Sequence, residues 1–363
     1  MKVAILGAGN AGCAVAADLT LKGHEVTLIK TSHAMHDDNY NYLISHKGKM
    51  TLNEFGAIKS ANIFKVTRDV KEIKDNEIVI VYIQSNYHEQ LIKKVSPYFE
   101  DDQIVLINPG YLSTAYVLKY SAGKNIIVAE AQSSFIDGRI MKPGLFRVGF
   151  RNVRNPIGIY PSSRKEEAIK KLDQLDEKLV YLDSVVEAAL HNPNLIVHTV
   201  GSVMSIPRIE KSKGDFCLYH EVYTRDNPAT WRILEALDNE KMDVLEALGF
   251  ERLSYVEACK YRNSLDDSID AKEVFLEYAE MPSRAKGPTV VDSRYISEDV
   301  PQGLVMMEAL GKILGVSTPI TTGLIAIASA ALGRDLRSEG RTPEVLGIEN
   351  IENILRDCGK NEI

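Results

Sequence analysis

Residues 1–30, MKVAILGAGNAGCAVAADLTLKGHEVTLIK, decide the fold of this chain. A β-branched run at residues 2–6 ends in glycines, residues 13–22 have the apolar spacing of a helix, and residues 25–30 form a second strand-like run. Strand, tight turn, helix and strand make a βαβ unit of roughly 30 residues, in which the two strands are parallel. The beginning of the chain therefore predicts a parallel sheet with a helix packed on it.

The turn of this unit carries the glycine pattern GxGxxG, with Gly7, Gly9 and Gly12 at its three fixed positions and Asn10 and Ala11 between the last two. Gly7 permits a tight turn, Gly9 lets a pyrophosphate approach the backbone, and Gly12 lets helix and strand pack closely. The N–H groups at the beginning of the helix, those of Asn10 and Ala11 included, would bind the phosphates. We therefore expect a dinucleotide site; the alternative is a plain glycine turn.

The residues after the second predicted strand bear on the choice of dinucleotide. At this place an acidic side chain usually binds the ribose 2′-OH of NAD. The sequence instead has Lys30, Thr31 and Ser32, one cation and two hydroxyls that could contact a 2′-phosphate. We predict a preference for NADP(H); NAD(H) stays an alternative, because Lys30 could simply extend into solvent as most lysines do.

Further strand-like runs alternate with helix-compatible segments as far as residue 160, an alternation typical of a Rossmann-type, doubly wound parallel sheet. The runs lie at residues 62–66, 77–83, 103–107 and 125–129, with weaker ones at 146–150 and 157–160, and a charged amphipathic helix at 164–175 would cover the last edge. From residue 184 onward three-to-four apolar spacing replaces these runs. We expect an α/β domain at residues 1–183 and a mostly α-helical domain at residues 184–363. Its predicted helices are residues 194–206, 229–247, 254–262, 303–314 and 321–332, with a short one after residue 350.

Two loops of the first domain are further candidates for cofactor contact. Ile83 and Gln84 end the strand at 77–83, and Asn108 follows the strand at 103–107. Both loops lie at the carboxyl edge, where open α/β sheets bind ligands, so we expect them to face the nicotinamide. For Asn108 a simple turn is an equal alternative, because the Pro-Gly pair that follows it favours one.

Composition excludes several classes of protein. The 363 residues carry 43 Lys+Arg against 50 Asp+Glu, and a formal net charge of -7 argues against a nucleic-acid partner. The four cysteines are widely separated, so we expect reduced thiols and no metal site. A strand at the start leaves no room for a signal peptide, and no apolar stretch reaches the ~20 residues of a membrane span. We expect a cytoplasmic protein.

A histidine and an aspartate in the second domain are candidates for acid–base chemistry. Asn192 and Pro193 read as the N-cap and first residue of a helix that carries His198, while His191 lies just before this helix and is less constrained. Asp299 precedes another helix and could simply cap it. A histidine paired with a carboxylate is the usual oriented general acid/base, but spacing alone favours a core role for His198 and does not show that the two meet.

Several segments together resemble the octopine/nopaline (opine) dehydrogenases. They are GAGNAG (7–12), NPNLIVH (192–198), PRIE (207–210), the run from Arg294-Tyr295 through EDVPQGL (298–304), residues 311–319 and LGRD (332–335). The resemblance implies a Rossmann domain followed by a helical domain, and NAD(P)H-dependent reduction of the imine that an amino acid forms with a 2-oxo acid. It also implies that His198 is the catalytic histidine and Asp299 its partner.

The substrates' carboxylates need cations, for which Arg208 and Arg294 are candidates because arginine binds carboxylates bidentately; either could instead form a surface ion pair. Gln132 lies in a loop that resembles the family's, although a turn or surface role fits equally. Where the family often has NPGR, this chain has Asn-Pro-Gly-Tyr at residues 108–111. The alternatives are a 3-hydroxyacid or ketopantoate-type reductase, in which we expect a catalytic lysine instead, and a noncatalytic NADP(H)-binding regulator. The identity of the substrates and the oligomeric state, a homodimer included, stay open.

Overall fold

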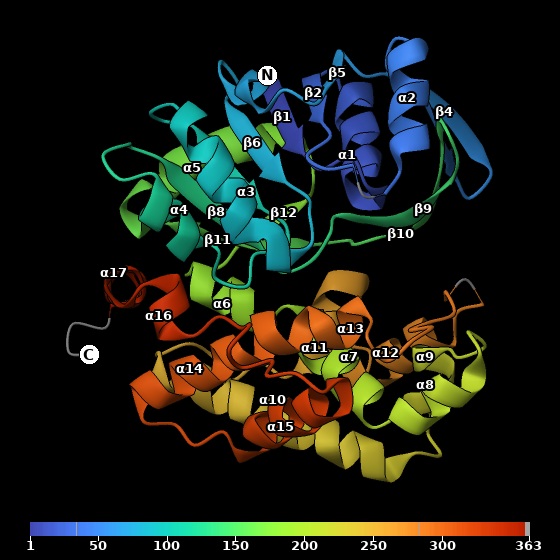
Figure 1. The fold of residues 1–363 in the computed structure, drawn as a ribbon, viewed down its shortest axis with the longest axis vertical. Coiled ribbons are helices and arrows are strands. Elements are labelled where there is room, and N and C mark those ends of the chain that lie inside the picture. The colour runs from blue at the N-terminus through green and yellow to red at the C-terminus, as the bar shows by residue number, and fades with distance from the viewer. Residues whose placement is uncertain (34, 283, 360–363) are drawn as a thin grey trace. The chain divides into compact units, whose positions relative to one another are not determined.

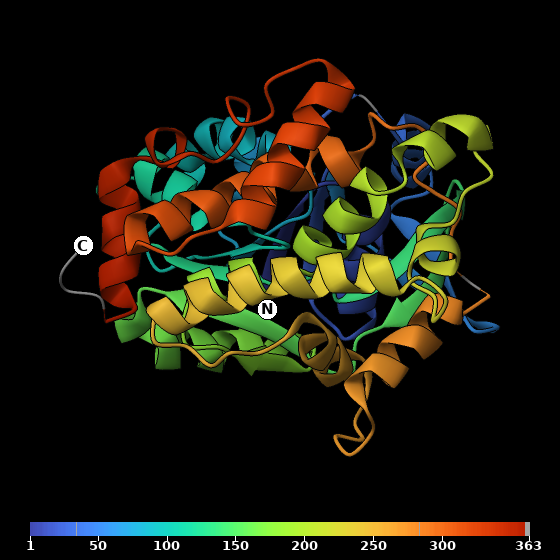
Figure 2. The same cartoon turned by 90° about the horizontal axis from the view of Figure 1, so that it is seen from below.

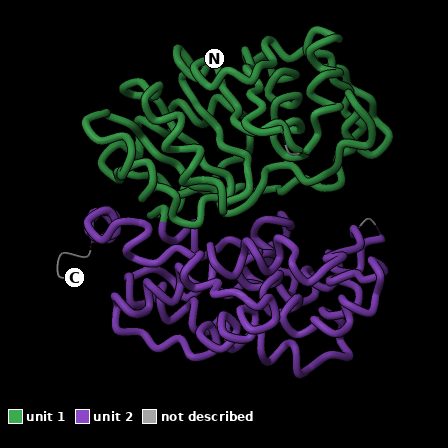
Figure 3. The backbone as a smooth tube through the Cα atoms, in the orientation of Figure 1, with its two compact units in different colours: residues 1–185 green, residues 186–363 purple. Residues whose placement is uncertain are grey.

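The chain forms two compact units, residues 1–185 and residues 186–363 (Figure 3). The computed structural model describes residues 1–33, 35–282 and 284–359. The division into units falls two residues after residue 183, where the first domain was predicted to end. Within the described ranges, no helix is both long and apolar enough to cross a membrane.

The first unit is built on an eight-stranded sheet with the order β12-β11-β8-β7-β6-β1-β2-β5 (Figure 1). Its strands are β1 (Lys2–Leu6), β2 (Glu25–Ile29), β5 (Lys65–Thr67), β6 (Ile78–Val81), β7 (Ile104–Ile107), β8 (Ile127–Ala131), β11 (Asn155–Tyr160) and β12 (Leu179–Tyr181). Neighbouring strands are parallel except β11 and β8, which are antiparallel. The central strands β6 and β7 are buried at every position, as in sheets covered on both faces. The predicted Rossmann-type sheet is confirmed, with two further strands, β11 and β12, that run antiparallel to the other six.

A second, four-stranded sheet, not predicted from the sequence, packs on helix α1 (Asn10–Leu21). Its order is β4-β3-β10-β9, formed by β3 (Lys49–Glu54), β4 (Ala57–Asn62), β9 (Ile136–Lys142) and β10 (Leu145–Arg151). Helix α1 contacts all four of these strands as well as β1 and β2. Its residues Gly12 to Leu19 are buried without interruption, which explains why α1 is apolar on nearly every face.

Two predicted strands were wrong in position, and this small sheet is the reason. The run at 62–66 covers the end of β4 and the start of β5, which belong to different sheets, and the run at 146–150 is part of β10 in the small sheet. Strands β4 and β9 have mostly exposed positions with charged residues and no regular apolar alternation, so the sequence pattern did not reveal them. The helices of this unit are α1, α2 (Asp37–Ser45), α3 (His88–Val95), α4 (Thr114–Tyr120) and α5 (Lys165–Leu172), of which α5 corresponds to the helix predicted at 164–175.

The second part of the chain is helical, as predicted, and Figure 2 shows its longest helix, α10, in yellow. The helices are α6 (Val185–Leu190), α7 (Pro193–Val203), α8 (Ile206–Ser212), α9 (Leu218–Val222), α10 (Pro228–Ala247), α11 (Tyr255–Asn263), α12 (Ala271–Glu280), α13 (Arg294–Ser297), α14 (Val305–Leu314), α15 (Pro319–Leu332), α16 (Pro343–Leu346) and α17 (Ile348–Asp357). The helix predicted at 194–206 ends at Val203, and α12 was not predicted. A π-helical turn, Val300–Leu304, leads into α14. Gly315 and Gly333 end α14 and α15 in the left-handed conformation, as expected of C-caps.

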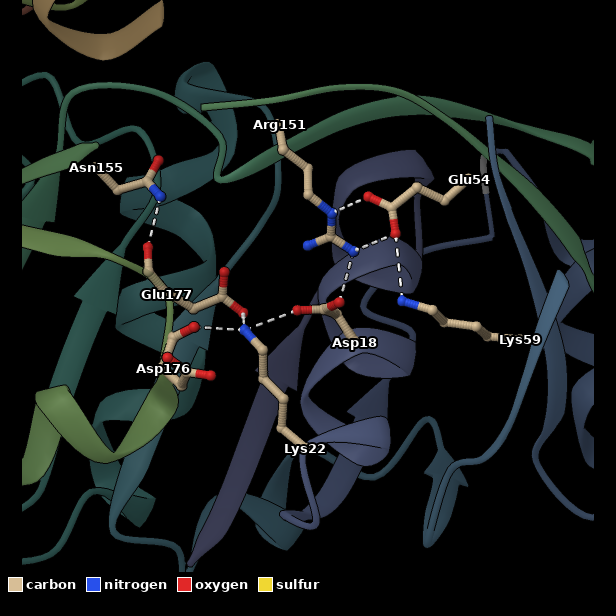
Figure 4. Close-up of polar contacts among 8 residues, drawn as sticks. All are labelled: Asp18, Lys22, Glu54, Lys59, Arg151, Asn155, Asp176 and Glu177. Carbon is tan, nitrogen blue, oxygen red and sulfur yellow. Dashed lines mark hydrogen bonds and ion pairs between the residues drawn. The ribbon is translucent and has the colours of Figure 1, made fainter. Parts of the chain in front are cut away.

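Ion pairs fasten α1 to its neighbours in the first unit (Figure 4). Lys22, at the C-terminal end of α1, lies 2.9 Å from both Asp18 and Glu177, while Arg151 on β10 binds Asp18 at 2.6 Å and also Glu54 on β3. Burial raises the pKa of Glu177 to about 8, against the opposing charge of Lys22. Burial would raise the pKa of Asp18 too, but hydrogen bonds from Arg151 and Lys22 outweigh it and hold that pKa at about 2. The network therefore anchors the helix whose other end forms the predicted phosphate site.

Candidate active site

The loop after β1 has the geometry that a dinucleotide pyrophosphate requires. Gly7 has a φ of 123°, and a Cβ on it would lie 2.1 Å from the carbonyl oxygen of Tyr82. A Cβ on Gly12 would lie 1.8 Å from the carbonyl oxygen of Gly7, so neither position accepts a side chain. A Cβ on Gly9, by contrast, meets no heavy atom within 4 Å in the described part of the chain. The space beside Gly9 is open, as close approach of a phosphate demands.

The first turn of α1 offers free donors and no negative charge. The first bond of the helix runs from the Cys13 N–H to the Gly9 carbonyl at 3.0 Å, so the N–H groups of Asn10, Ala11 and Gly12 have no partner within the helix. The first turn contains no acidic residue. The Asn10 side chain accepts a hydrogen bond from the Ile140 N–H of β9 at 2.8 Å, so it fastens the loop to the small sheet. These features fit a nicotinamide dinucleotide, with the backbone of residues 10–12 on its phosphates.

The surroundings of Lys30, at the end of β2, differ from the prediction. Lys30 is buried, and its Nζ lies 2.8 Å from the Ser32 carbonyl oxygen and 3.2 Å from Asp37 Oδ1. Arg68, which follows β5, donates to the same two groups, each at 2.8 Å. Thr31 is half-buried and Ser32 is exposed. Two cations therefore surround one carboxylate where the ribose 2′ position of a dinucleotide was expected to lie.

The expectation that no acid stands near this place is wrong, because helix α2 begins with Asp37. A hydrogen bond from Arg68 lowers the pKa of Asp37 to about 2, so the carboxylate is charged at neutral pH. Arg68 was missed as well, although a signal for it exists. Strand β5 pairs with β2 in parallel, so residues that follow the two strands come to the same edge of the sheet.

A buried histidine that the sequence analysis missed holds the loops after β6 and β7. His88 Nδ1 lies 2.7 Å from Ser113 Oγ, and its Nε2 lies 3.2 Å from the Ile83 carbonyl oxygen. The ring is fully buried, whereas Ile83 and Gln84 are half-buried. His88 therefore fixes the backbone at the carboxyl edge of the sheet, where these two predicted cofactor contacts lie.

In the side-chain amide of Asn108, which follows β7, one atom has a hydrogen-bond partner among the described residues and the other has none. Its Nδ2 donates to the Tyr82 hydroxyl at 2.9 Å, while its buried Oδ1 has no hydrogen-bond partner among the described residues. A buried acceptor without a donor costs roughly 1–3 kcal/mol, which an N–H of a bound ligand would relieve. The loop that follows is more than a simple turn, because Glu130 on β8 accepts hydrogen bonds from the N–H groups of Leu112 at 2.8 Å and Thr114 at 2.6 Å.

The three predicted substrate-binding residues have different surroundings. Gln132 follows β8 and is buried. Arg208 already forms a two-pronged ion pair with Glu221, its Nε 2.7 Å and its Nη2 3.1 Å from the carboxylate oxygens, so the surface ion pair describes it better. Arg294 is half-exposed on α13, with Glu298 at 3.8 Å. Of the two arginines, Arg294 is thus the less tightly paired with a neighbouring carboxylate.

His198 and Asp299 meet in the second unit. The beginning of α7 is as predicted, with Asn192 accepting from the Asn194 N–H at 3.1 Å. One and a half turns later, His198 Nδ1 lies 2.8 Å from Asp299 Oδ2, and the two residues are 5% and 1% exposed. Asp299 makes no side-chain capping bond to the helix after it, so the interpretation of Asp299 as a cap is wrong.

This pair has the form of an oriented general acid/base. A carboxylate that accepts from the Nδ1–H fixes the tautomer and the direction of the imidazole, and it favours the imidazolium when a proton arrives. Because Nδ1 is engaged by Asp299, Nε2 is the nitrogen that can exchange a proton with a substrate.

His191 is not the loosely held residue that its position before α7 suggested. It is 4% exposed, and neither ring nitrogen has a hydrogen-bond partner among the described residues. Burial, together with the positive charges of Lys241 and Arg262, lowers the pKa of His191 far below its ordinary value. His191 is therefore a neutral core residue.

Comparison with known proteins separates the two parts of the chain. Residues 181–332 match the family model described as "NAD/NADP octopine/nopaline dehydrogenase, alpha-helical domain", and residues 3–130 match "Ketopantoate reductase PanE/ApbA". An opine dehydrogenase of Arthrobacter sp. (strain 1C) is 25% identical over 354 residues, which cover 96% of this chain and 95% of that protein. An octopine dehydrogenase solved with NADH and agmatine has a TM-score of 0.76 at 17% identity, with 100% and 99% of the two chains covered. A yersinopine dehydrogenase with NADP+ bound has a TM-score of 0.71 at 14% identity, with 99% of both covered.

Fold and sites together define a two-domain, Rossmann-type oxidoreductase with a helical second domain. The model of the amino-terminal part is shared with ketopantoate reductases, but the helical part that carries His198 and Asp299 matches the opine enzymes. The comparisons therefore support the octopine/nopaline (opine) dehydrogenase family, whose helical-domain model matches residues 181–332.

Proposed function

We propose that this protein is an NAD(P)H-dependent opine dehydrogenase that reduces the imine formed between an amino acid and a 2-oxo acid, and that catalyses the reverse oxidation. The observation that carries the proposal is the buried His198–Asp299 pair, within the segment that matches the helical domain of the opine enzymes. The reaction acts on a CH–NH bond and yields an N-(carboxyalkyl) amino acid.

The residues of the chain have different roles in this reaction, which follow from their charges. The dinucleotide supplies a hydride when bound. Addition of a hydride to the imine carbon leaves the nitrogen in need of a proton, which His198 Nε2 donates; in the reverse direction the same atom accepts it. Asp299 keeps the ring oriented and stabilises its charged form. Arg294 is our candidate for a substrate carboxylate, because a guanidinium binds a carboxylate through two parallel hydrogen bonds.

For the cofactor we propose NADP(H) over NAD(H). The cations Lys30 and Arg68 stand against the single carboxylate of Asp37 at the end of β2, so this corner has a surplus of positive charge. A 2′-phosphate would gain charge-assisted hydrogen bonds there, provided that Asp37 yields its partners. Solved relatives of this fold hold NADH in one case and NADP+ in another.

An activity screen tests the proposal directly. Purified protein is given NADPH or NADH, a panel of amino acids, and pyruvate, glyoxylate or 2-oxoglutarate, and oxidation of the cofactor is followed by absorbance. We expect oxidation only when an amino acid and an oxo acid are both present. Oxidation with an oxo acid alone, ketopantoate included, would instead favour the ketopantoate-type reductase that residues 3–130 also match. Cofactor binding without turnover on any pair would favour a regulator.

A further inference from the structure

The imidazole of His198 is covered on one face by a tyrosine ring. Tyr295, on the short helix α13, stacks on His198 with ring centroids 3.8 Å apart and planes only 5° from parallel. At this separation the two rings are in face-to-face van der Waals contact. Tyr295 is itself half-buried.

This stack and the Asp299 hydrogen bond constrain the imidazole in different ways. A single hydrogen bond at Nδ1 restrains one atom of the ring, but rotation about the Cβ–Cγ bond of a histidine is soft, so the ring can still rock about that bond. A parallel ring against one face restricts this motion. Because Tyr295 and Asp299 are only four residues apart, the segment from α13 to the π-helical turn supplies both constraints to α7. Nε2 is thereby held in one direction.

We propose that Tyr295 is a positioning residue, which holds the imidazole of His198 in a fixed direction and so keeps Nε2 aimed at the atom with which it exchanges a proton. This inference rests on the function proposed above for His198. The ring stack itself concerns the histidine alone and can be measured without any substrate.

Other titratable groups near α7 have different neighbours. Helices α8, α9, α10, α11, α13 and α15 and the π-helical turn all contact α7, and α15 carries no titratable side chain. Titratable groups on the other elements have contacts of their own, among them Lys241 with Asp238, Glu240 with Thr321, Arg208 with Glu221, Arg294 with Glu298, Tyr223 with the Val197 carbonyl, and Arg262 beside His191. Tyr295 and Asp299 are the groups whose contact with the His198 ring itself the structure shows.

Substitution of the ring tests the proposal. Tyr295→Phe keeps the stack and should retain turnover within about threefold, whereas Tyr295→Leu removes the aromatic face and should lower kcat roughly tenfold or more, with little change in KM. Tyr295→Met fills the same space with a flexible chain and serves if the leucine variant folds poorly. Tyr98→Leu, a half-buried tyrosine with Lys71 and Lys74 near its ring, is the matched control.

Two further measurements show whether Tyr295 acts through His198. In a His198→Ala background, Tyr295→Leu should cause almost no additional loss of turnover, because the group it positions is gone. Without substrate, the ring signals of His198 in NMR, recognised by their absence in His198→Ala, should move in Tyr295→Leu, because the ring current of the stacked tyrosine is gone, and should stay close to their original positions in Tyr295→Phe.

The outcomes separate the two proposals. Absence of any opine activity together with the expected shift in NMR would overturn the proposed function and leave the role of Tyr295 standing. Three outcomes would overturn the role of Tyr295: unmoved ring signals of His198 in Tyr295→Leu, an equal loss of turnover in Tyr295→Phe and Tyr295→Leu, or a full additional loss of turnover in the His198→Ala background.

Discussion

A single pair of side chains, His198 and Asp299, carries the proposed proton transfer, and each can be changed without altering the backbone. His198→Ala should lower turnover roughly 10²- to 10⁴-fold, the contribution usual for a positioned acid/base, while cofactor affinity stays the same. Asp299→Asn keeps the size of the side chain but loses the charge that favours imidazolium, so it should also lower turnover. Steady-state kinetics and a cofactor titration measure both effects.

His46→Ala is the control for this pair, because His46 is an exposed histidine at the end of α2. It should keep the activity of the unaltered protein. Full activity in His198→Ala would remove the acid–base role, and a lower melting temperature with unchanged turnover in Asp299→Asn would make the aspartate a structural residue.

Arg68 is the residue on which the cofactor preference should depend most. Lys30 is buried and bound to Asp37, whereas the Arg68 side chain is 27% exposed and could turn toward a 2′-phosphate. Arg68→Ala should weaken NADPH binding by about 10- to 100-fold, the value of a charge-assisted contact, and leave NADH binding within about threefold. Competitive fluorescence titration of both cofactors measures the ratio.

Asp37→Asn should act in the opposite direction, because it removes the carboxylate that competes with a phosphate for Arg68. The ratio of NADPH to NADH affinity should therefore rise. If Arg68→Ala weakens the binding of NADPH and of NADH equally, Arg68 supports the loop and does not select the cofactor.

At the scale of elements, we expect substitution of two glycines at the amino end of α1 to have opposite effects. Gly9→Val places a side chain in open space, so the protein should fold with an unchanged melting temperature but lose cofactor affinity, since that space is where the pyrophosphate would lie. Gly12→Val drives a side chain into the Gly7 carbonyl and should destabilise the first unit itself.

Thermal unfolding with and without NADPH distinguishes the two variants. A ligand at 100 times its Kd adds about 2.7 kcal/mol to the stability of the folded state, so the unaltered protein should melt at a higher temperature with cofactor. Gly9→Val should lose this increase and Gly12→Val should already melt lower without cofactor. An undiminished increase in Gly9→Val would place the phosphate site elsewhere.

At the scale of the whole molecule, one buried carboxyl beside the ion pairs of α1, that of Glu177, makes stability depend on pH. The pKa of Glu177 is about 8 in the folded protein against an ordinary value of 4.5, so between these values the folded state binds more protons than the unfolded state. Its contribution to stability is fully present below about pH 4.5 and is lost as the pH rises through 8. The melting temperature should therefore fall from pH 5 to pH 8, by roughly 3 °C or more.

Glu177→Gln has no carboxyl to titrate and should lose this part of the pH dependence. Glu25→Gln, at an exposed position on β2, should keep it. Melting curves of the unaltered protein and both variants at pH 5 and pH 8 test this prediction. If the melting temperature of Glu177→Gln falls as much between these pH values as that of the unaltered protein, Glu177 is not the source of the pH dependence. The pKa of Asp18 is lowered from 3.8 to about 2, so its titration changes stability only at pH values below those of this experiment.

The sequence by itself determined what depends on neighbouring residues. The βαβ unit at residues 1–30, the roles of Gly7 and Gly12 and the beginning of α7 at Asn192 follow from local sterics and hydrogen bonding, which the order of residues specifies directly. The switch from short strands to helices after residue 184 follows from apolar periodicity in the same way.

Only the tertiary structure decided what depends on residues far apart in the chain. The meeting of His198 with Asp299 joins positions 101 residues apart, and Arg68 comes 31 residues after its partner Asp37. The small sheet on α1, the burial of His191 and the stack of Tyr295 are likewise contacts across the fold. No local pattern encodes such contacts, because they arise when packing of the apolar core brings separate elements together and excludes water from the polar groups between them.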